Sequence, residues 1–330
     1  MSSNFTIRSL AYAVAVSGIL SMPAAAETLK LAHWVPPAHV LTKSTLEPLQ
    51  QAVSAAAADL EIKVYPGGEL GKGPLEQYVR AVQGVADIVW GLPGYTSSQF
   101  PRLMVSELPG VLPDGMTGYD LIWNAYDKGL LSSEFPGTVP LALWLSEPNI
   151  FIMKDRDVRT PDDVKGLKIR VSGAAAAAVM EALGATPVQM PAGEIYNALQ
   201  TGLIDGVITG ASAVGDFKLD EVANSYTIGA PLGRISFYLV MNKDRFDGLS
   251  DAQKAALNGI VGRKLSKSAE DGWGARAVSV IESLKAAGDN TVIELTSDEA
   301  AKFGALTLPV KDKIVAELGA EDVLKAMQGQ

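Results

Sequence analysis

Arg170 is the residue whose position in this sequence most clearly suggests chemistry. It ends residues 161–170 (PDDVKGLKIR), in which a capped turn leads into a short strand. A guanidinium held at the end of a strand presents parallel N–H donors that match a carboxylate. Residues 171–180 are typical of a helix start, whose free backbone N–H groups favour an anion. Strand, arginine and helix together predict a site for an organic acid.

Aromatic residues at the predicted strand ends could form the walls of that site. Ligand pockets are mostly apolar with a few polar anchors, so we expect Trp34, Trp90 and Trp144 to contact a ligand. Ordinary core packing is the alternative for such large side chains. The other residues expected to bind the ligand are His33, Asn149, Phe151, Ser172, Thr209 and Phe237. We therefore expect a monocarboxylate with a bulky, ring-bearing or apolar body.

The sequence offers little for metal binding or catalysis. It has no Cys, and its histidines are His33 and His39, which show no metal-ligand spacing with the acidic residues. Residues 210–215 (GASAVG) do not fit the nucleophile elbow of a serine hydrolase. We expect no metal, no cofactor and no enzyme, although enzymes do occur on related folds.

Two similar segments indicate that the elements form two α/β lobes. Residues 81–91 and 198–210 both read as a helix end, a Gly turn, an Asp, an apolar strand and a Gly. Coincidence between two ordinary αβ joints is the alternative. Ligands bind beyond the carboxyl ends of strands in open α/β sheets. Trp90 and Thr209 are therefore expected on opposite walls of one cleft.

A long helical pattern over residues 250–287 predicts a strut across both lobes. It begins with a capping box of Ser250 and Gln253, and Gly262, Gly272 and Gly274 permit a break. No linker rich in Pro, Gly or Ser separates the halves of the chain. We therefore expect lobes joined by several chain crossings, as in a hinge protein.

The first 26 residues are typical of a secretory signal peptide. They combine Arg8, an apolar run at 10–20 and a small-residue cleavage site at 24–26, and a membrane anchor is the competing interpretation. No later stretch is apolar and long enough to span a bilayer. The formal net charge of -9 argues against nucleic acid and anionic lipid as partners. We expect a periplasmic protein, cleaved after residue 26, without membrane insertion of the mature chain.

Several segments together resemble the extracytoplasmic solute-binding subunit of TRAP transporters, the DctP-like family. The resemblance covers nearly all of residues 27–330, and the GLKIR and ALQTGxxDG blocks are specific in combination. The segments that carry it are 65–71 (YPGGELG), 161–171, 182–187 (ALGATP), Met190, 194–206 (EIYNALQTGLIDG) and 240–242 (VMN).

The resemblance implies an α/β, two-lobed fold like that of type II periplasmic binding proteins, with hinge strands and a long lobe-spanning helix. Lobe I is expected at 27–147 and 236–277, and lobe II at 148–235 and 278–330. Such a protein closes around a small organic acid and delivers it to the membrane permease subunits. We expect this chain to be a monomer. Arg170 matches the family's carboxylate-binding arginine; a structural arginine that bridges the lobes is the alternative.

Two departures from the family pattern bear on the ligand. Thr209 stands where many members carry Asn, and Ile150 stands where some carry a second Arg. A second carboxylate would lack that partner, which weakens a C4-dicarboxylate assignment. A C4-dicarboxylate or sugar acid in the same system remains open. An ABC-type receptor or a ligand sensor for a membrane kinase also remains open.

Overall fold

The computed structural model describes residues 26–57 and 59–330. Residues 1–25 of the predicted signal peptide, including Arg8 and the apolar run at 10–20, lie outside these residues. Within the described ranges, no helix has the length and apolar character needed to cross a membrane.

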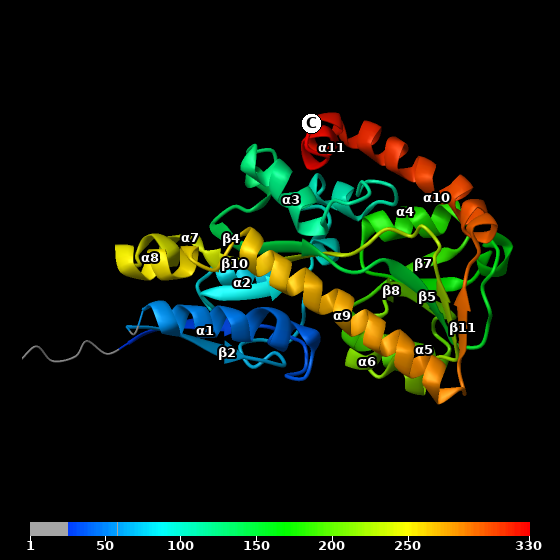
Figure 1. The fold of residues 1–330 in the computed structure, drawn as a ribbon, viewed down its shortest axis with the longest axis horizontal. Coiled ribbons are helices and arrows are strands. Elements are labelled where there is room, and N and C mark those ends of the chain that lie inside the picture. The colour runs from blue at the N-terminus through cyan, green and yellow to red at the C-terminus, as the bar shows by residue number, and fades with distance from the viewer. Residues whose placement is uncertain (1–25, 58) are drawn as a thin grey trace, which may run out of the picture.

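The described chain folds around two sheets that lie next to each other, with helices packed around them (Figure 1). Sheet A has the order β2-β1-β3-β10-β4, and sheet B the order β11-β9-β5-β8-β6-β7. We call the bodies built on sheets A and B lobe I and lobe II. This arrangement confirms the expected two-lobed α/β fold; the exact lobe boundaries stay a prediction.

The strands of both sheets are short, and the inner strands are more buried than the edge strands β2, β7 and β11. β3 and β8 are buried along their whole length, which suits strands covered on both faces. β10 runs antiparallel between β3 and β4. Sheet A contains β1 (Glu27–Ala32), β2 (Leu60–Tyr65), β3 (Ile88–Gly91), β4 (Thr138–Leu145) and β10 (Ser236–Asn242). Sheet B contains β5 (Asn149–Met153), β6 (Lys168–Val171), β7 (Thr186–Gln189), β8 (Gly206–Gly210), β9 (Ser225–Ile228) and β11 (Thr291–Glu294).

Several helices and one short turn begin at signals that the sequence already carries. Capping boxes join Thr160 to Asp163, Ser250 to Gln253 and Thr296 to Glu299. The α-helices are α1 (Glu47–Ala56), α2 (Gln77–Val82), α3 (Gly118–Asp127), α4 (Ala174–Ala182), α5 (Ile195–Thr201), α6 (Ser212–Asp216), α7 (Lys243–Asp247), α8 (Asp251–Asn258), α9 (Arg263–Ala287), α10 (Ser297–Leu318) and α11 (Glu321–Met327). The shorter turns are η1 (Thr42–Leu46), η2 (Pro93–Thr96), η3 (Leu103–Glu107), η4 (Ser132–Glu134), η5 (Pro161–Val164), η6 (Ala192–Glu194) and η7 (Leu219–Glu221).

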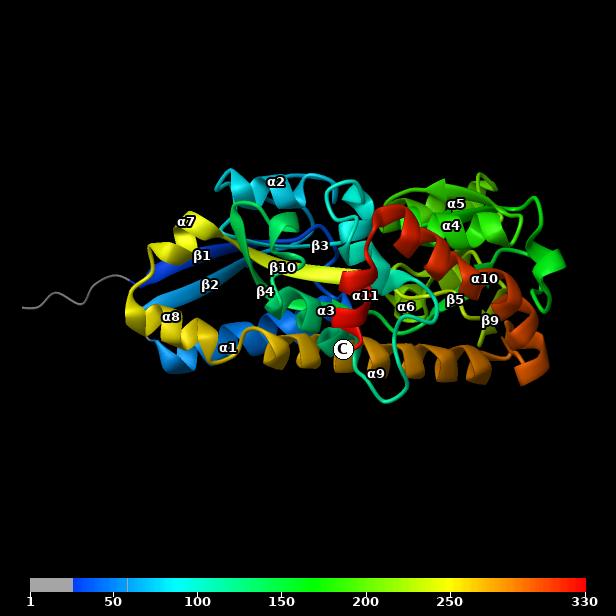
Figure 2. The ribbon, with the colours of Figure 1, turned by 90° about the horizontal axis from the view of Figure 1, so that it is seen from above.

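The chain passes between the lobes several times, as expected for a hinge protein. Residues 146–148 join β4 to β5, and residues 229–235 join β9 to β10. α9 has 25 residues, which makes it about 37 Å long. It contacts β4 in lobe I and α6 and β11 in lobe II, and Figure 2 shows it running beneath both. The single helix expected over 250–287 is broken, because Gly262 takes a φ of 75° between α8 and α9.

The C-terminal helices return from lobe II to lobe I (Figure 1). α10 contacts α4, and α11 packs against α3 and η3. Arg102 in lobe I pairs with Asp322 of α11 at 2.6 Å. The chain therefore ends on the lobe in which its first strand lies.

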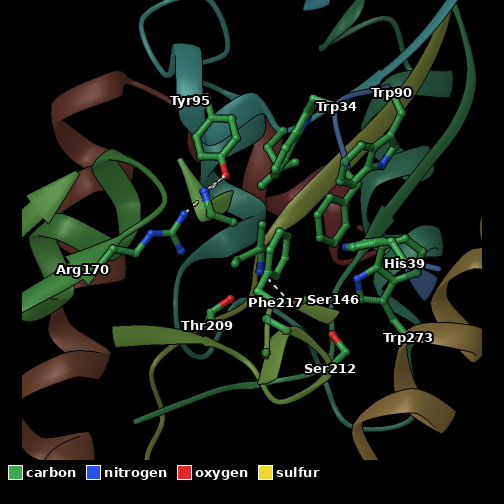
Figure 3. Close-up of a pocket in the computed structure, with 16 residues that line it drawn as sticks. Trp34, His39, Trp90, Tyr95, Ser146, Arg170, Thr209, Ser212, Phe217 and Trp273 are labelled. Atoms are coloured by element: carbon green, nitrogen blue, oxygen red, sulfur yellow. Dashed lines mark hydrogen bonds between the residues drawn. The ribbon is translucent and has the colours of Figure 1, made fainter. Parts of the chain in front are cut away.

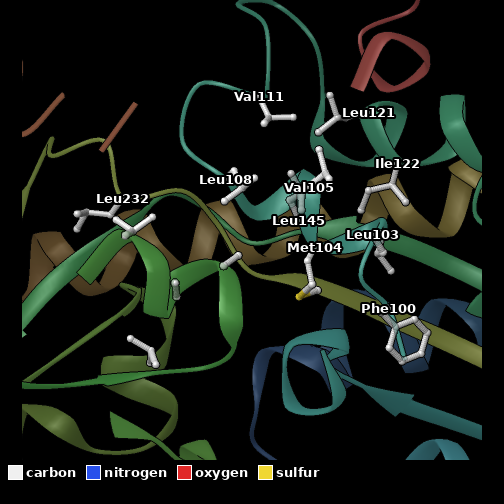
Figure 4. Packing of buried hydrophobic residues seen from close by; sticks show 14 of the residues in the cluster. Phe100, Leu103, Met104, Val105, Leu108, Val111, Leu121, Ile122, Leu145 and Leu232 are labelled. Atoms are coloured by element: carbon white, nitrogen blue, oxygen red, sulfur yellow. The ribbon is translucent and has the colours of Figure 1, made fainter. Parts of the chain in front are cut away.

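One apolar cluster links η3, α3 and the end of β4. Figure 4 shows Met104 and Val105 beside Ile122 and Leu145, all of which are buried. The same cluster includes Val179 of α4 in lobe II. The two lobes therefore share one apolar cluster and are not packed independently of each other.

Glu107, at the end of η3, is bound to the start of β10. Its Oε1 accepts hydrogen bonds from the backbone N–H of Ser236 at 2.8 Å and from the Ser236 hydroxyl at 2.6 Å. Its backbone carbonyl accepts from Arg234 N–H at 3.0 Å. Complete burial raises the pKa of Glu107 to about 7. The Glu107 carboxyl therefore fixes residues 229–235 to lobe I where they enter β10. Its burial also makes ionisation of the carboxyl cost free energy.

Candidate functional site

A cavity of about 40 Å³ lies where the two lobes face each other (Figure 3). Lobe I contributes residues from β3, β10 and η2, lobe II contributes residues from β6 and β8, and α9 contributes one ring. The lining consists of Trp34, His39, Trp90, Leu92, Tyr95, Ser146, Arg170, Ala192, Thr209, Gly210, Ser212, Ala213, Phe217, Ile235, Phe237 and Trp273. Six of these side chains are Trp, Tyr or Phe, so aromatic rings are the commonest large side chains in the walls.

The strand ends bring the facing walls together. Trp90 lies near the carboxyl end of β3, and Thr209 lies near the carboxyl end of β8. Both line the cavity, from lobe I and lobe II respectively. This is the opposed arrangement that the two αβ joints predict.

Arg170 is buried in the cavity wall without a counter-charge. It is 1% exposed, and its Nε donates to the Met190 carbonyl at 3.0 Å. No acidic group of the described residues lies within ion-pair distance of its guanidinium. Figure 3 shows one terminal nitrogen directed at Tyr95 and the other toward the side of Thr209. Burial without an anion lowers the pKa of Arg170 and costs free energy that a bound carboxylate would recover.

Tyr95 connects Arg170 to the opposite lobe. Its hydroxyl accepts from Ala192 N–H at 2.9 Å and from Arg170 Nη2 at 3.4 Å. Burial raises the pKa of Tyr95, so its hydroxyl stays neutral. Arg170 thus combines the two roles that the sequence left open. It contacts the other lobe through Tyr95, and it keeps N–H donors that could bind an anion.

Four rings form a continuous stack along one wall. Phe237 and Trp90 have ring centroids 5.6 Å apart, and Trp90 and Trp34 have the same separation. Phe217 of lobe II stacks on Trp34 at 6.1 Å with an interplanar angle of 19°. The stack therefore begins in sheet A and ends on a ring that the other lobe supplies.

His39 forms the far end of the cavity, away from Arg170. Its Nδ1 accepts from Leu41 N–H at 3.1 Å, which leaves the proton on Nε2. Nε2 lies 3.6 Å from Asp216, whose other oxygen accepts from Arg276 Nε at 3.1 Å. Burial lowers the pKa of His39 to about 3, so the imidazole is neutral. Arg170 is then the one fully charged side chain among the described lining residues.

Five of the ten residues expected to bind a ligand line this cavity: Arg170, Trp34, Trp90, Thr209 and Phe237. Trp144 does not line the cavity. It packs behind the lining residue Phe237, with the two ring centroids 5.4 Å apart. Phe151 faces the core and packs on Phe303 at 5.8 Å. A strand alternates its side chains between two faces, and the sequence does not say which face meets the cavity.

The remaining three expected residues also lie outside the lining. Asn149 donates to the Leu232 carbonyl at 3.4 Å and so belongs to the chain crossings. Ser172 is buried beside Gly94. His33 is buried, and its backbone N–H donates to Tyr65 at the end of β2.

The start of α4 does not contribute to the cavity as the sequence suggests. Ala174 N–H donates to the Ser97 hydroxyl of lobe I at 3.2 Å, so a first-turn donor is already taken. Arg170 therefore lines the cavity, whereas no residue of α4 is among the lining residues. Tyr95, Phe217, Trp273 and His39 were missed by the sequence analysis as lining residues.

Replacement of Gly173 by alanine is expected to weaken ligand binding at least tenfold. A Cβ at Gly173 would lie 2.5 Å from the carbonyl oxygen and 2.6 Å from the Cα of Gly94 in lobe I. Its φ of -171° is ordinary extended backbone, so the clash opposes only the approach of the lobes. Calorimetry and small-angle scattering would measure affinity and closure. Gly193→Ala, where no atom lies within 4 Å, is the control. Equal affinity of both variants would contradict the expectation.

Similarity to known proteins extends over nearly the whole chain. Residues 31–318 match the family described as bacterial extracellular solute-binding protein, family 7 (DctP). The chain is 29% identical over 320 residues to the C4-dicarboxylate-binding periplasmic protein DctP of Rhodobacter capsulatus, and the match covers 94% of each chain.

Two solved structures share the fold and have aromatic acids bound. A TRAP solute-binding protein from Rhodoferax ferrireducens, in complex with copurified benzoate, has a TM-score of 0.85 and 27% identity, covering 92% of this chain and 97% of that one. A marine metagenome TRAP solute-binding protein specific for aromatic acid ligands, with 3-hydroxybenzoate, has a TM-score of 0.85 and 25% identity, covering 92% and 98%.

Proposed function

Since the chain belongs to family 7 of the bacterial extracellular solute-binding proteins, the solute-binding subunits of TRAP transporters, we propose that it captures an aromatic monocarboxylate through Arg170. The observation that carries this proposal is a buried guanidinium without an acidic partner among the described residues. A bidentate carboxylate supplies the missing charge and accepts the free N–H donors.

The walls favour a ring as the body of this acid. Trp34, Trp90 and Phe237 present stacked aromatic surface, and Trp273 closes the far side. Offset and edge-on contacts between rings contribute beyond the burial of their area. The likeness to proteins with bound benzoate and 3-hydroxybenzoate supports the same ligand class.

A C4-dicarboxylate is the second candidate, because the Rhodobacter capsulatus relative is described as binding that class. It requires a second cation, and Arg170 is the one charged side chain in the described lining. Ile150, at the position of the second arginine, is 3% exposed and packs in the core of lobe II. A sugar acid would place its hydroxyl groups against walls whose polar side-chain groups besides Arg170, Tyr95 and His39 include the hydroxyls of Ser146, Thr209 and Ser212 and the indole N–H groups of Trp34 and Trp90, so the stacked rings favour an aromatic body over it.

The proposed mechanism is hinge closure followed by delivery to the membrane permease that the family implies. The carboxylate meets Arg170 first, because charge attraction acts over the longest range. The lobes then close and exclude water, with Tyr95 and Ala192 meeting across the cleft. The family consists of receptors, so binding and release are the whole of its chemistry.

Calorimetry with a panel of acids tests the proposed ligand class. Benzoate and mandelate are expected to bind at least a hundredfold more tightly than succinate, glucuronate or phenylalanine. Phenylalanine is the most informative control. It has the same ring and carboxylate but also an ammonium group, and the described lining residues include no acidic side chain to pair with it. Tight binding of succinate with no binding of benzoate would contradict the proposal.

A further inference from the structure

The cavity is too small for the ligand class proposed above. Its volume is about 40 Å³, whereas an engineered apolar cavity of about 150 Å³ is the size that binds benzene. An aromatic acid therefore enters only if part of the wall moves.

Most wall residues are held from several sides. Trp90 is 1% exposed and lies between the faces of Trp34 and Phe237. Trp273 is 3% exposed and packs on Phe237 at 5.1 Å. Tyr95 is tied through its hydroxyl to Ala192. Displacing any of these would open the packed core of lobe I or break a hydrogen bond.

Phe217 is held differently from the other rings. Among the described lining residues it is the aromatic ring that lobe II supplies. Like Trp34 it is only partly buried, but Trp34 packs against the apolar cluster of lobe I, whereas Phe217 lies between the clusters of the two lobes. Its stacking partner is Trp34, and its edge-on partner is His39 at 5.6 Å. These contacts cross the cleft, so they weaken when the lobes part.

The backbone beside Phe217 is also unusual. Lys218 takes a φ of 55°, and it is the one residue other than glycine with a positive φ in the described chain. Such a conformation is uncommon for a residue with a side chain and marks a turn held by its surroundings. Asp216, which precedes Phe217, is anchored by Arg276 and by Val40 N–H. Phe217 therefore lies between an anchored residue, Asp216, and a residue with an uncommon backbone conformation, Lys218.

We propose that Phe217 is the displaceable ring that sets which acids this site accepts. The ring of the ligand takes its place against Trp34, and Phe217 turns aside to the rim of the cavity, where its side chain still fills space. This inference rests on the proposed function for its ligand class, whereas the movement of Phe217 stands on the geometry given above. Phe217 then limits size, because a second fused ring would need the same space.

Phe217→Ala tests the proposal. If Phe217 were a fixed wall residue that contacts the ligand, its truncation would weaken binding. Here the variant should bind benzoate as tightly as the wild type or up to about tenfold more tightly, because the stack on Trp34 no longer has to be broken. It should also bind 2-naphthoate at least tenfold more tightly than the wild type does. Phe217→Leu should fall between the two, which covers the case of a poorly folded alanine variant.

Phe246→Ala is the matched control, because Phe246 is also partly buried against the core of lobe I but lies outside the cavity lining. It should leave both affinities unchanged. A loss of benzoate affinity of more than tenfold in Phe217→Ala would overturn the proposal and make Phe217 a fixed contact. Unchanged affinity for naphthoate would overturn it as well.

A neutral probe separates this inference from the proposed function. Benzene has no carboxylate, so it should raise the melting temperature of Phe217→Ala but not that of the wild type or Phe246→Ala. If the wild type bound no aromatic acid, the proposed function would fail while benzene still tested the space behind Phe217. If benzene left Phe217→Ala unaffected, the inference would fail.

Discussion

Replacement of Arg170 by alanine is expected to raise the Kd for benzoate by about 10²- to 10⁴-fold. Breaking a buried charge pair costs about 3 to 5 kcal/mol, and each 1.4 kcal/mol corresponds to tenfold in affinity. Arg170 is 1% exposed, so little water would replace the lost donors. Titration calorimetry of the purified protein measures the change directly.

Stability is expected to move differently from affinity in this variant. The unliganded protein loses a buried charge without an acidic partner, so its cooperative unfolding should be kept and its melting temperature should not fall sharply. Arg170→Lys should bind at an intermediate level, because an ammonium lacks the planar fork. Arg159→Ala, which removes an exposed arginine paired with Glu299 at 3.3 Å, is the control. Unchanged benzoate affinity in Arg170→Ala would refute the assignment.

Replacement of Glu107 by glutamine is expected to stabilise the fold by about 3 kcal/mol at pH 8. Burial raises the pKa of Glu107 from 4.5 to about 7. Because the folded pKa lies above the unfolded one, the folded protein binds the extra proton between these values. Stability is therefore lost as the pH rises from about 5 to above 7. Glutamine keeps an oxygen for the two donors of Ser236 and carries no charge.

Urea unfolding at pH 5, 6, 7 and 8 tests this expectation. The difference between Glu107→Gln and the wild type should grow with pH and level off above 7. Burial lowers the pKa of His33 to about 4 and that of His39 to about 3, so these residues destabilise the fold only as the pH falls below 6.5. Glu181→Gln, at an exposed position of α4, is the control. A difference that stays constant across the pH range would count against a titrating Glu107.

The sequence predicted the parts of this site that local pattern determines. Arg170 stands out because it ends a short strand after a capped turn, and Trp90 and Thr209 because each follows a helix, a Gly turn and an Asp. The helix start at α4 was predicted, but its contact with Ser97 was not, because Ser97 lies far away in the chain and on the other lobe. Phe217 follows a five-residue helix, so nothing in its local pattern indicated a cavity. Such contacts depend on how the lobes meet, which no single segment encodes.

The position of β10 in sheet A has a consequence for the order in which the chain can fold. β10 joins β3 to β4, so any N-terminal fragment that ends before Ser236 leaves both strands without their shared neighbour. Lobe I is complete only after more than two thirds of the 330 residues have been synthesised. Pairing over so long a separation is slow. Slow pairing of this kind suits a polypeptide that has to cross a membrane before it folds.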